Sequence, residues 1–166
     1  MRLPEIYGEV IGYGSTCDAN HITAPLADGA QAARAMTMAI EDGAITAADV
    51  DYINAHGTST PLNDASETLA VKKAFGAAAM KPYVSSTKSM SGHLLGASGA
   101  LEAIISTLAV KNGFVPATIN YRHADPACDL NLVVNEGKQA DIRIAMSNSL
   151  GFGGHNASIL IRRWEK

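Results

Sequence analysis

Strand-like and helix-like segments alternate along most of the chain, and this alternation limits the folds it can adopt more than any other feature. Apolar residues alternate in short β-prone segments and recur at helical spacing in the longer segments between them. Strands that alternate with helices pack as a layered α/β domain, and two adjacent strands at the end add an antiparallel pair. The sequence has no internal repeat, linker or low-complexity tract. Residues 1–166 are therefore predicted to form one α/β domain around a mixed sheet.

Turn, cap and breaker residues give the boundaries of these elements. The predicted strands cover residues 5–14, 51–55, 82–88, 129–134, 141–150 and 155–164. Residues 114–120 are expected to be extended because Pro116 disfavours helix at the preceding position. The predicted helices cover residues 30–42, 61–75 and 98–112, and each is followed by a glycine.

Local patterns add detail to these elements. Asp28 is the expected N-cap of the first helix, whose buried face is predicted to contain Ala33, Met36 and Ile40. The predicted buried face of the third helix consists of Leu101, Ile104, Ile105 and Leu108. Thr46 and Asp49 are typical of a short capped turn. The last two strands are expected to pair as a hairpin across the GFGG segment, residues 151–154.

Charge, hydropathy and cysteine content argue against several classes of function. The formal net charge is -3 and the charges are scattered, so no basic stripe is present that could neutralise the phosphates of nucleic acid. No apolar run approaches the ~20 residues that span a bilayer, and the first residues lack the apolar core of a secretory signal. Cys17 and Cys128 lack metal-binding spacing, which indicates reduced thiols in packing roles. We expect a cytoplasmic protein that binds neither nucleic acid nor membrane.

Polar residues gather in three segments, each at the end of a predicted strand. These segments are NAHGTSTPLND (54–64), SSTKSMSGHLLGASGALE (85–102) and SNSLGFGGHN (147–156). Ligands of α/β sheets bind at the edge where such strands end. His56, Lys88 and His93 are expected to converge there. Two imidazoles beside a cation could stabilise an oxyanion or enolate as negative charge develops on it.

Each of these residues also has an ordinary structural interpretation. A single histidine after a strand is more often a satisfied structural residue, and Thr58 and Thr60 could simply cap the following helix. The GFGG segment is compatible with a plain turn, and Glu102 with an exposed helix position. A metal site is disfavoured, because the five histidines fit no metal-binding spacing and no acidic cluster accompanies a pair. Only the combination of the three segments favours a catalytic site.

Together, HGTSTPLND, SSTKSMSGHLLGASGALE and NSLGFGGHN resemble the ketoacyl synthase family, a branch of the thiolase-like fold, over essentially the whole chain. The resemblance implies an α/β, thiolase-like half: a layered α-β-α domain with a mixed five-stranded sheet. It implies that His56 and His93 donate hydrogen bonds to the malonyl thioester oxygen during decarboxylation. It also implies that Lys88 tunes and orients these histidines, and that Glu102 pairs with Lys88.

The resemblance implies further roles at matching positions. The hydroxyls of Thr23, Thr58 and Thr60 would hold the phosphopantetheine arm, although Ala24 stands where relatives often have a serine. Phe152 resembles a gating phenylalanine whose backbone N–H helps to form an oxyanion hole. Its flanking glycines, Gly151 and Gly153, would let it swing.

Supporting and cation-binding residues are implied in the same way. Asp64, in the first turn of the second helix, is counted among the supporting residues. A buried monovalent cation is predicted at Asn54, Glu102, Ser147 and Asn148. No other cofactor is expected.

The family's nucleophile is a cysteine at a helix N-terminus in the N-terminal half, and neither Cys17 nor Cys128 matches it. The resemblance therefore implies that this chain corresponds to the second of two pseudo-repeated halves. The intact enzyme is expected to be a homodimeric acyltransferase. It would elongate an acyl chain on acyl carrier protein in fatty acid synthesis, by decarboxylative condensation with malonyl-carrier protein. Without its N-terminal half, the chain is expected to be inactive in condensation.

Three other functions stay open at this point. A ketosynthase of polyketide assembly shares all three motifs. A non-catalytic module that binds carrier protein or pantetheine would use the same loops. A thiolase acting on coenzyme A ranks lower, because the second cysteine of that branch is not seen.

Overall fold

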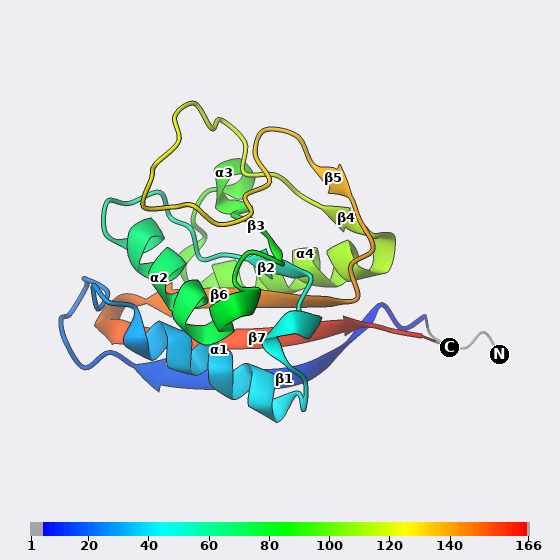
Figure 1. Cartoon of the computed structure of the whole chain (residues 1–166), viewed down its shortest axis with the longest axis horizontal. Coiled ribbons are helices and arrows are strands. Elements are labelled where there is room, and N and C mark those ends of the chain that lie inside the picture. The colour runs from blue at the N-terminus through cyan, green and yellow to red at the C-terminus, as the bar shows by residue number, and fades with distance from the viewer. Residues whose placement is uncertain (1–4, 166) are drawn as a thin grey trace.

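The computed structural model describes residues 5–165, and its centre is a mixed five-stranded sheet (Figure 1). The strand order is β1-β7-β6-β2-β3. The strands are β1 (Gly8–Cys17), β2 (Tyr52–Asn54), β3 (Tyr83–Ser85), β6 (Ile144–Gly151) and β7 (His155–Arg163). β2 pairs in parallel with β3 and β6, whereas β7 pairs antiparallel with β6 and β1. The predicted mixed sheet and the terminal hairpin are both confirmed.

Three main helices cover the sheet: α1 (Ala30–Asp42), α2 (Asn63–Phe75) and α4 (Ser98–Asn112). The shorter elements are α3 (Lys88–Ser91), β4 (Phe114–Val115), β5 (Lys138–Gln139) and the 3-10 turns η1 (Ala47–Asp49), η2 (Gly76–Ala78), η3 (Leu95–Ala97) and η4 (Phe152–Gly154). The turn η1 carries the predicted capping box between Thr46 and Asp49. None of the helices within residues 5–165 is long and apolar enough to cross a bilayer.

The helices form layers on both faces of the sheet. Side chains alternate across a strand, so neighbouring residues of β2 and β6 enter different cores. Ile53 and Met146 pack in one core with residues of α1 and α2. Tyr52 and Ala145 pack in the other core with Ala109 and Val110 of α4. The predicted α-β-α layering is therefore present.

Helix α1 lies unusually close to the edge strand β1. A Cβ added at Gly12 would lie 2.2 Å from the carbonyl oxygen of Ala39, and one at Gly14 would lie 2.0 Å from that of Ala35. The two glycines therefore allow backbone to pack directly on backbone. The predicted buried face of α1 is confirmed, because Ala33, Met36 and Ile40 are all buried.

Two expectations at helix ends and faces need correction. The N-cap of α1 is Gly29 in the left-handed region, and Asp28 lies one position earlier, where it accepts a hydrogen bond from the Ala30 amide at 3.0 Å. In α4 the predicted buried face is wrong, since Ile104 is 57% exposed and Leu108 is 40% exposed. Small and polar side chains face the sheet instead: Ser98, Glu102, Ser106, Ala109 and Val110. This face meets the polar site described below, and the apolar side points away from the sheet.

The predicted strand at 129–134 is also largely absent. Only two isolated parallel bridges form there, Val84 with Leu132 and Thr118 with Val134. The reason is local: the amides of Leu132 and Glu136 bond to carbonyls two residues earlier, which turns the backbone away from a regular ladder. Residues 129–134 are therefore part of a longer irregular segment, the strap 118–134, which crosses beside β3 (Figure 1).

Candidate active site

One edge of the sheet collects all three polar segments. β2, β3 and β6 run in the same direction, and β1 shares it because it is antiparallel to β7. The loops that follow these strands therefore leave the sheet at the same edge. That edge is where α/β sheets commonly bind ligands.

His56 and His93 meet at this edge. Their ring centroids are 5.3 Å apart and the ring planes are inclined by 84°, an edge-to-face arrangement. His93 Nδ1 accepts a hydrogen bond from the Leu95 amide at 3.2 Å and lies 2.9 Å from the Ser98 hydroxyl. Because Nδ1 accepts an N–H, the proton of a neutral His93 ring lies on Nε2, which can donate to a ligand.

Lys88 completes the cluster as a buried cation. Lys88 is 8% exposed and forms an ion pair with Glu102, which is 1% exposed. Burial raises the pKa of Glu102, and the hydrogen bond from Lys88 opposes that rise. The pairing of Lys88 with Glu102 follows the sequence expectation, and it places a fixed positive charge beside the two imidazoles.

This environment keeps His56 neutral. Burial, together with the electrostatic effects of Lys88 and then of His93, lowers the pKa of His56 to about 3. Its Nδ1 is buried and has no hydrogen-bond partner among residues 5–165. At neutral pH the site thus holds a neutral imidazole, which can donate a hydrogen bond without carrying charge into the pocket.

Glu67 is a buried site residue that the sequence analysis missed. Its carboxylate accepts the His56 amide at 2.9 Å and the Gly57 amide at 2.9 Å, so α2 holds the backbone of the loop that carries His56. Asn148 of β6 also donates to this carboxylate, at 3.3 Å. Asn63, one helical turn before Glu67, is buried as well, but no local pattern in the sequence marks either residue as part of a site.

The threonines of the HGTST segment lie at the open side of the site. The hydroxyls of Thr58 and Thr60 are 2.9 Å apart and hydrogen bond to each other. Between them, Ser59 adopts a left-handed conformation with φ of 59°, and its amide donates to Asp64 at 3.1 Å. Asp64 thus stabilises the turn that presents both hydroxyls.

The GFGG turn and the loop that carries Thr23 lie against each other. The Gly153 amide donates to the Ile22 carbonyl at 2.8 Å, and the Asp18 amide donates to the Gly154 carbonyl at 2.8 Å. Phe152 is 72% exposed, between Gly151 at the end of β6 and Gly153, which has a φ of 81°. The structure therefore brings Thr23 and Phe152 to the same edge.

The four predicted cation ligands are all buried, but most of their described oxygens already have partners. Asn54 Oδ1 accepts a hydrogen bond from Thr87, and Asn148 Oδ1 accepts one from Ser158 at 2.8 Å. Glu102 Oε2 is buried without a hydrogen-bond partner, and Ser147 is 4% exposed. Among residues 5–165 no group of three His, Cys, Asp or Glu side chains could hold a metal ion. A monovalent cation at Asn54, Glu102, Ser147 and Asn148 stays a prediction.

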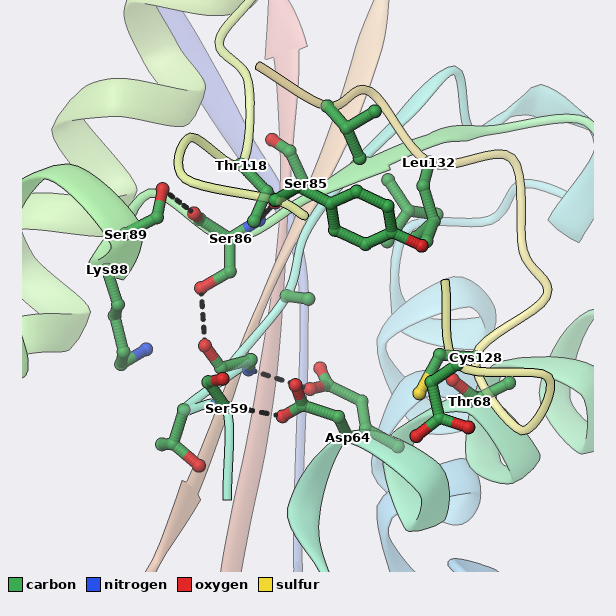
Figure 2. Close-up of a pocket in the computed structure, with 18 of the residues that line it drawn as sticks. Ser59, Asp64, Thr68, Ser85, Ser86, Lys88, Ser89, Thr118, Cys128 and Leu132 are labelled. Carbon is green, nitrogen blue, oxygen red and sulfur yellow. Dashed lines mark hydrogen bonds between the residues drawn. The ribbon is translucent and has the colours of Figure 1, made fainter. Parts of the chain in front are cut away.

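A cavity of about 790 Å³ extends from Lys88 and His93 under the strap 118–134. Figure 2 shows Ser59 and Asp64 on one side, Ser86 and Lys88 on another, and Thr68 with Cys128 on a third. Burial raises the pKa of the Cys128 thiol, which disfavours the reactive thiolate. The other cysteine, Cys17, is exposed at the end of β1, 3.4 Å from the Gly153 carbonyl.

Residues 7–122 match the family model of the C-terminal domain of β-ketoacyl synthases. The chain is 54% identical over 164 residues to 3-oxoacyl-[acyl-carrier-protein] synthase 2 of Staphylococcus aureus (strain COL), covering 99% of this chain and 40% of that protein. It is 50% identical to the enzyme of the same name from Synechocystis, covering 99% of this chain and 39% of that protein. The chain thus spans about 40% of the length of these relatives.

Solved structures of similar proteins agree on the fold. A type II polyketide ketosynthase, bound to a hexaketide and in complex with its acyl-carrier protein, superimposes with a TM-score of 0.94 at 40% identity, covering 97% of this chain and 40% of that chain. A β-ketoacyl synthase from Burkholderia phymatum superimposes with a TM-score of 0.90 at 40% identity, covering 97% of this chain and 38% of that chain. These similarities extend over the sheet, the helices and the candidate site.

Proposed function

This chain belongs to the β-ketoacyl synthase family as its C-terminal domain, and we propose that it supplies the half of the active site that stabilises an enolate during decarboxylative condensation. The intact protein would be an acyltransferase that extends an enzyme-bound acyl group with malonyl-carrier protein. The observation that carries the proposal is the edge-to-face pair of His56 and His93 beside the buried Lys88–Glu102 ion pair.

The reaction places specific demands on these residues. In the first step the bond between the malonyl carboxylate and the α-carbon breaks, carbon dioxide leaves, and the electron pair moves toward the thioester oxygen. His56, as a neutral imidazole, and His93 would each donate an N–H group to that oxygen as it becomes anionic. In the second step the α-carbon forms a bond to the acyl carbonyl, and the enzyme thiolate that carried the acyl group leaves. Fixed donors stabilise such a charge without reorganising, which is the main source of oxyanion catalysis.

Lys88 would act through the histidines. Its ammonium is fixed by Glu102, and its charge is one of the causes that keep the pKa of His56 low. A protonated His56 would add a second positive charge beside that of Lys88 in a buried space, whereas a neutral ring can bind the oxygen in both its neutral and anionic states. Lys88 therefore fits a role in tuning the histidine pair.

The open side of the site fits the arm that delivers the substrate. The paired hydroxyls of Thr58 and Thr60, together with Thr23, would hydrogen bond to the phosphopantetheine arm. Phe152 would gate the entrance, and its mobility would come from Gly151 and Gly153. The backbone N–H of Phe152 would complete the oxyanion hole for the acyl group.

The partner proposed for this site is an acyl carrier protein. A ketosynthase of the same fold has been solved in complex with its acyl-carrier protein, and the curated relatives carry acyl-carrier-protein in their names. The chain is 54% identical to a curated 3-oxoacyl-[acyl-carrier-protein] synthase and 40% identical to the polyketide ketosynthase. This difference favours fatty acid elongation as the pathway, with polyketide assembly as the second candidate. A homodimeric, cytoplasmic enzyme with its cysteine nucleophile in the rest of the protein completes the proposal.

Activity assays of this chain and of the full-length synthase test this function. By itself, the chain should not condense acyl- with malonyl-carrier protein, and the full-length synthase should be active. In the full-length enzyme, His56→Ala or His93→Ala should each reduce decarboxylation of malonyl-carrier protein by roughly 10²- to 10³-fold, the usual loss for an oxyanion donor. Lys138→Ala, at an exposed position in β5, is the control and should retain activity. Turnover by the chain alone, or full activity of both histidine variants, would contradict the proposal.

A further inference from the structure

Gly57, the residue after His56, is held at both of its backbone polar groups. Its N–H donates to Glu67 Oε2 at 2.9 Å, and its carbonyl accepts the Ser86 hydroxyl at 2.7 Å. These partners come from different elements: Glu67 lies in α2, and Ser86, labelled in Figure 2, follows β3. A Cβ at Gly57 would lie 2.4 Å from the Ser86 Cβ, so this close approach requires glycine.

Glu67 is suited to hold the loop because its carboxylate faces only donors. It accepts N–H groups from His56, Gly57, Asn63 and Asn148, and none of these four partners offers a lone pair to a carboxyl proton. Glu67 is 4% exposed, and burial raises the pKa of its carboxyl. A buried charge is costly unless it is fully hydrogen bonded, and here both oxygens are. The carboxylate therefore ties the His56 loop to α2 and, through Asn148, to β6.

Ser86 is suited to hold the loop because it is fixed itself. Its amide donates to the Thr118 hydroxyl at 2.9 Å, and its carbonyl accepts the Ser89 hydroxyl at 3.0 Å. Ser86 lies two residues before Lys88, at the entry to α3. The hydrogen bond from Ser86 to Gly57 thus connects the segment of His56 directly to the segment that carries Lys88 and His93.

We propose that Glu67 and Ser86 are positioning residues that hold Gly57 from two sides and thereby set the place of the His56 imidazole relative to Lys88 and His93. The two side chains contact backbone and neither needs to touch substrate. The catalytic consequence rests on the proposed function, but the structural consequence does not. A misplacement of about 1 Å in a catalytic group can reduce a rate by roughly 10²-fold, so a small shift of this loop would be measurable.

The first test measures the position of His56 through its ionisation in this chain. Nuclear magnetic resonance of the histidine ring carbons, followed against pH, gives the pKa of His56 in wild type, Ser86→Ala and Glu67→Gln. Ser86→Ala should raise the pKa of His56 by roughly one unit or more, because a loosened loop admits water and moves the ring from the charge on Lys88. Glu67→Gln should also shift this pKa, and it removes a carboxyl group in addition to loosening the loop. Ser86→Thr, which keeps the hydroxyl, should restore the wild-type value.

Ser66→Ala is the matched control. Ser66 is also buried, and its hydroxyl donates to a backbone carbonyl, that of Asn63, at 2.9 Å, but it does not contact Gly57. Its loss should leave the pKa of His56 unchanged. If Glu67→Gln does not fold, Ser86→Ala decides the question, because it removes one hydroxyl only. A folded Ser86→Ala chain with an unchanged His56 titration would overturn the proposal.

The second test measures catalysis in the full-length synthase. Ser86→Ala should lower kcat for malonyl decarboxylation by roughly tenfold or more, with little change of KM, because the arm-binding threonines are untouched. A normal kcat in a variant whose His56 pKa has shifted would overturn the link from position to rate. A wild-type synthase without activity would count against the proposed function. It would not affect the positioning role of Glu67 and Ser86, because the His56 titration is measured without substrate.

Discussion

Burial favours the neutral forms of both His56 and Glu67, yet their partners give them different charge states. His56 Nδ1 is buried without a partner among residues 5–165, and nearby Lys88 opposes a second positive charge. Glu67 instead accepts N–H groups at both carboxylate oxygens, which favours the ionised form. The neutral ring and the Glu67 carboxyl are joined through the backbone amide of His56, so the hydrogen bonds of Glu67 support the placement of the ring.

The pKa of His56 makes a prediction about stability. Its pKa is about 3 in the folded chain, against an ordinary value of 6.5, so the unfolded chain binds a proton more readily between these values. The stabilisation is present above pH 6.5 and is lost as the pH falls toward 3, on the order of 3 kcal/mol by pH 4. His56→Gln should therefore lose less unfolding free energy than wild type between pH 7 and pH 4, measured by urea denaturation. Equal losses in the two chains would contradict the pKa assignment, and His123→Gln should behave as wild type.

Motif residues were predictable from the sequence, whereas the residues that hold them were not. His56, Lys88 and His93 follow strand ends, and the structure brings them together. Glu67 lies in a helix that mixes polar and apolar residues, and the local pattern does not distinguish it from a solvated glutamate. Ser86 is one of two adjacent serines after a strand. Their importance depends on which backbone groups lie opposite them, and this is fixed only by tertiary packing.

At the scale of elements, α4 shows why helical periodicity alone gave the wrong face. Positions 101, 104, 105 and 108 are apolar and share one side, but the sheet-facing side carries Glu102 and Ser106 instead. Glu102 must face inward because Lys88, at the start of α3, is buried beneath α4 and needs a counter-charge. An apolar stripe predicts that one face of a helix is buried, but the stripe does not specify which surface packs against that face.

The ion pair between α3 and α4 predicts an unequal cost of single and double substitutions. Glu102→Leu leaves the buried Lys88 ammonium without its carboxylate and should lower the unfolding free energy by about 3–5 kcal/mol. The double variant Lys88→Met with Glu102→Leu should recover much of that loss, because no charge stays buried. Urea denaturation of this chain measures both.

An exposed ion pair supplies the control for this experiment. Lys73 and Asp28 are 3.2 Å apart with side chains 47% and 59% exposed, so Lys73→Met should change the unfolding free energy by less than about 1 kcal/mol. A loss in Glu102→Leu as small as this control would show that the Lys88–Glu102 pair contributes little.

The close packing of β1 on α1 gives a second prediction at the element scale. Gly14→Ala places a Cβ 2.0 Å from the Ala35 carbonyl, and backbone on backbone cannot yield as a flexible side chain would. The strand and helix must separate, which should cost about 3 kcal/mol of unfolding free energy. Gly96→Ala, where nothing lies within 4 Å of the added Cβ, should change it by less than about 0.5 kcal/mol. If thermal or urea unfolding gives the two variants the same unfolding free energy, the tight contact between β1 and α1 is ruled out.

At the scale of the whole molecule, the outer side of α4 carries apolar side chains that the described residues leave exposed. Ile104 and Leu108 lie on one side of this helix at 57% and 40% exposure, and Leu95, just before the helix, is 71% exposed. The chain spans about 40% of the length of its curated relatives. The layered α/β arrangement and the mixed sheet could be predicted from the strand and helix alternation, because one chain determines them. What packs against the outer side of α4 could not be predicted, because that side faces away from its own sheet.

An uncovered apolar helix face predicts self-association of this chain in solution. Sedimentation velocity over increasing concentration should show a shift from monomer to larger species. Replacing Ile104 and Leu108 together by lysine should return the chain to monomer, because charges on that face cannot be buried against a second copy. Met80→Lys, at a residue 56% exposed after α2, adds the same kind of charge elsewhere and should leave the association unchanged. A wild-type chain that stays monomeric throughout, or a double variant that associates as before, would show that this face of α4 is stable in water. In that case the exposed side chains would reflect tolerance of scattered apolar surface, which is common in folded proteins, and association would have to be sought at another face.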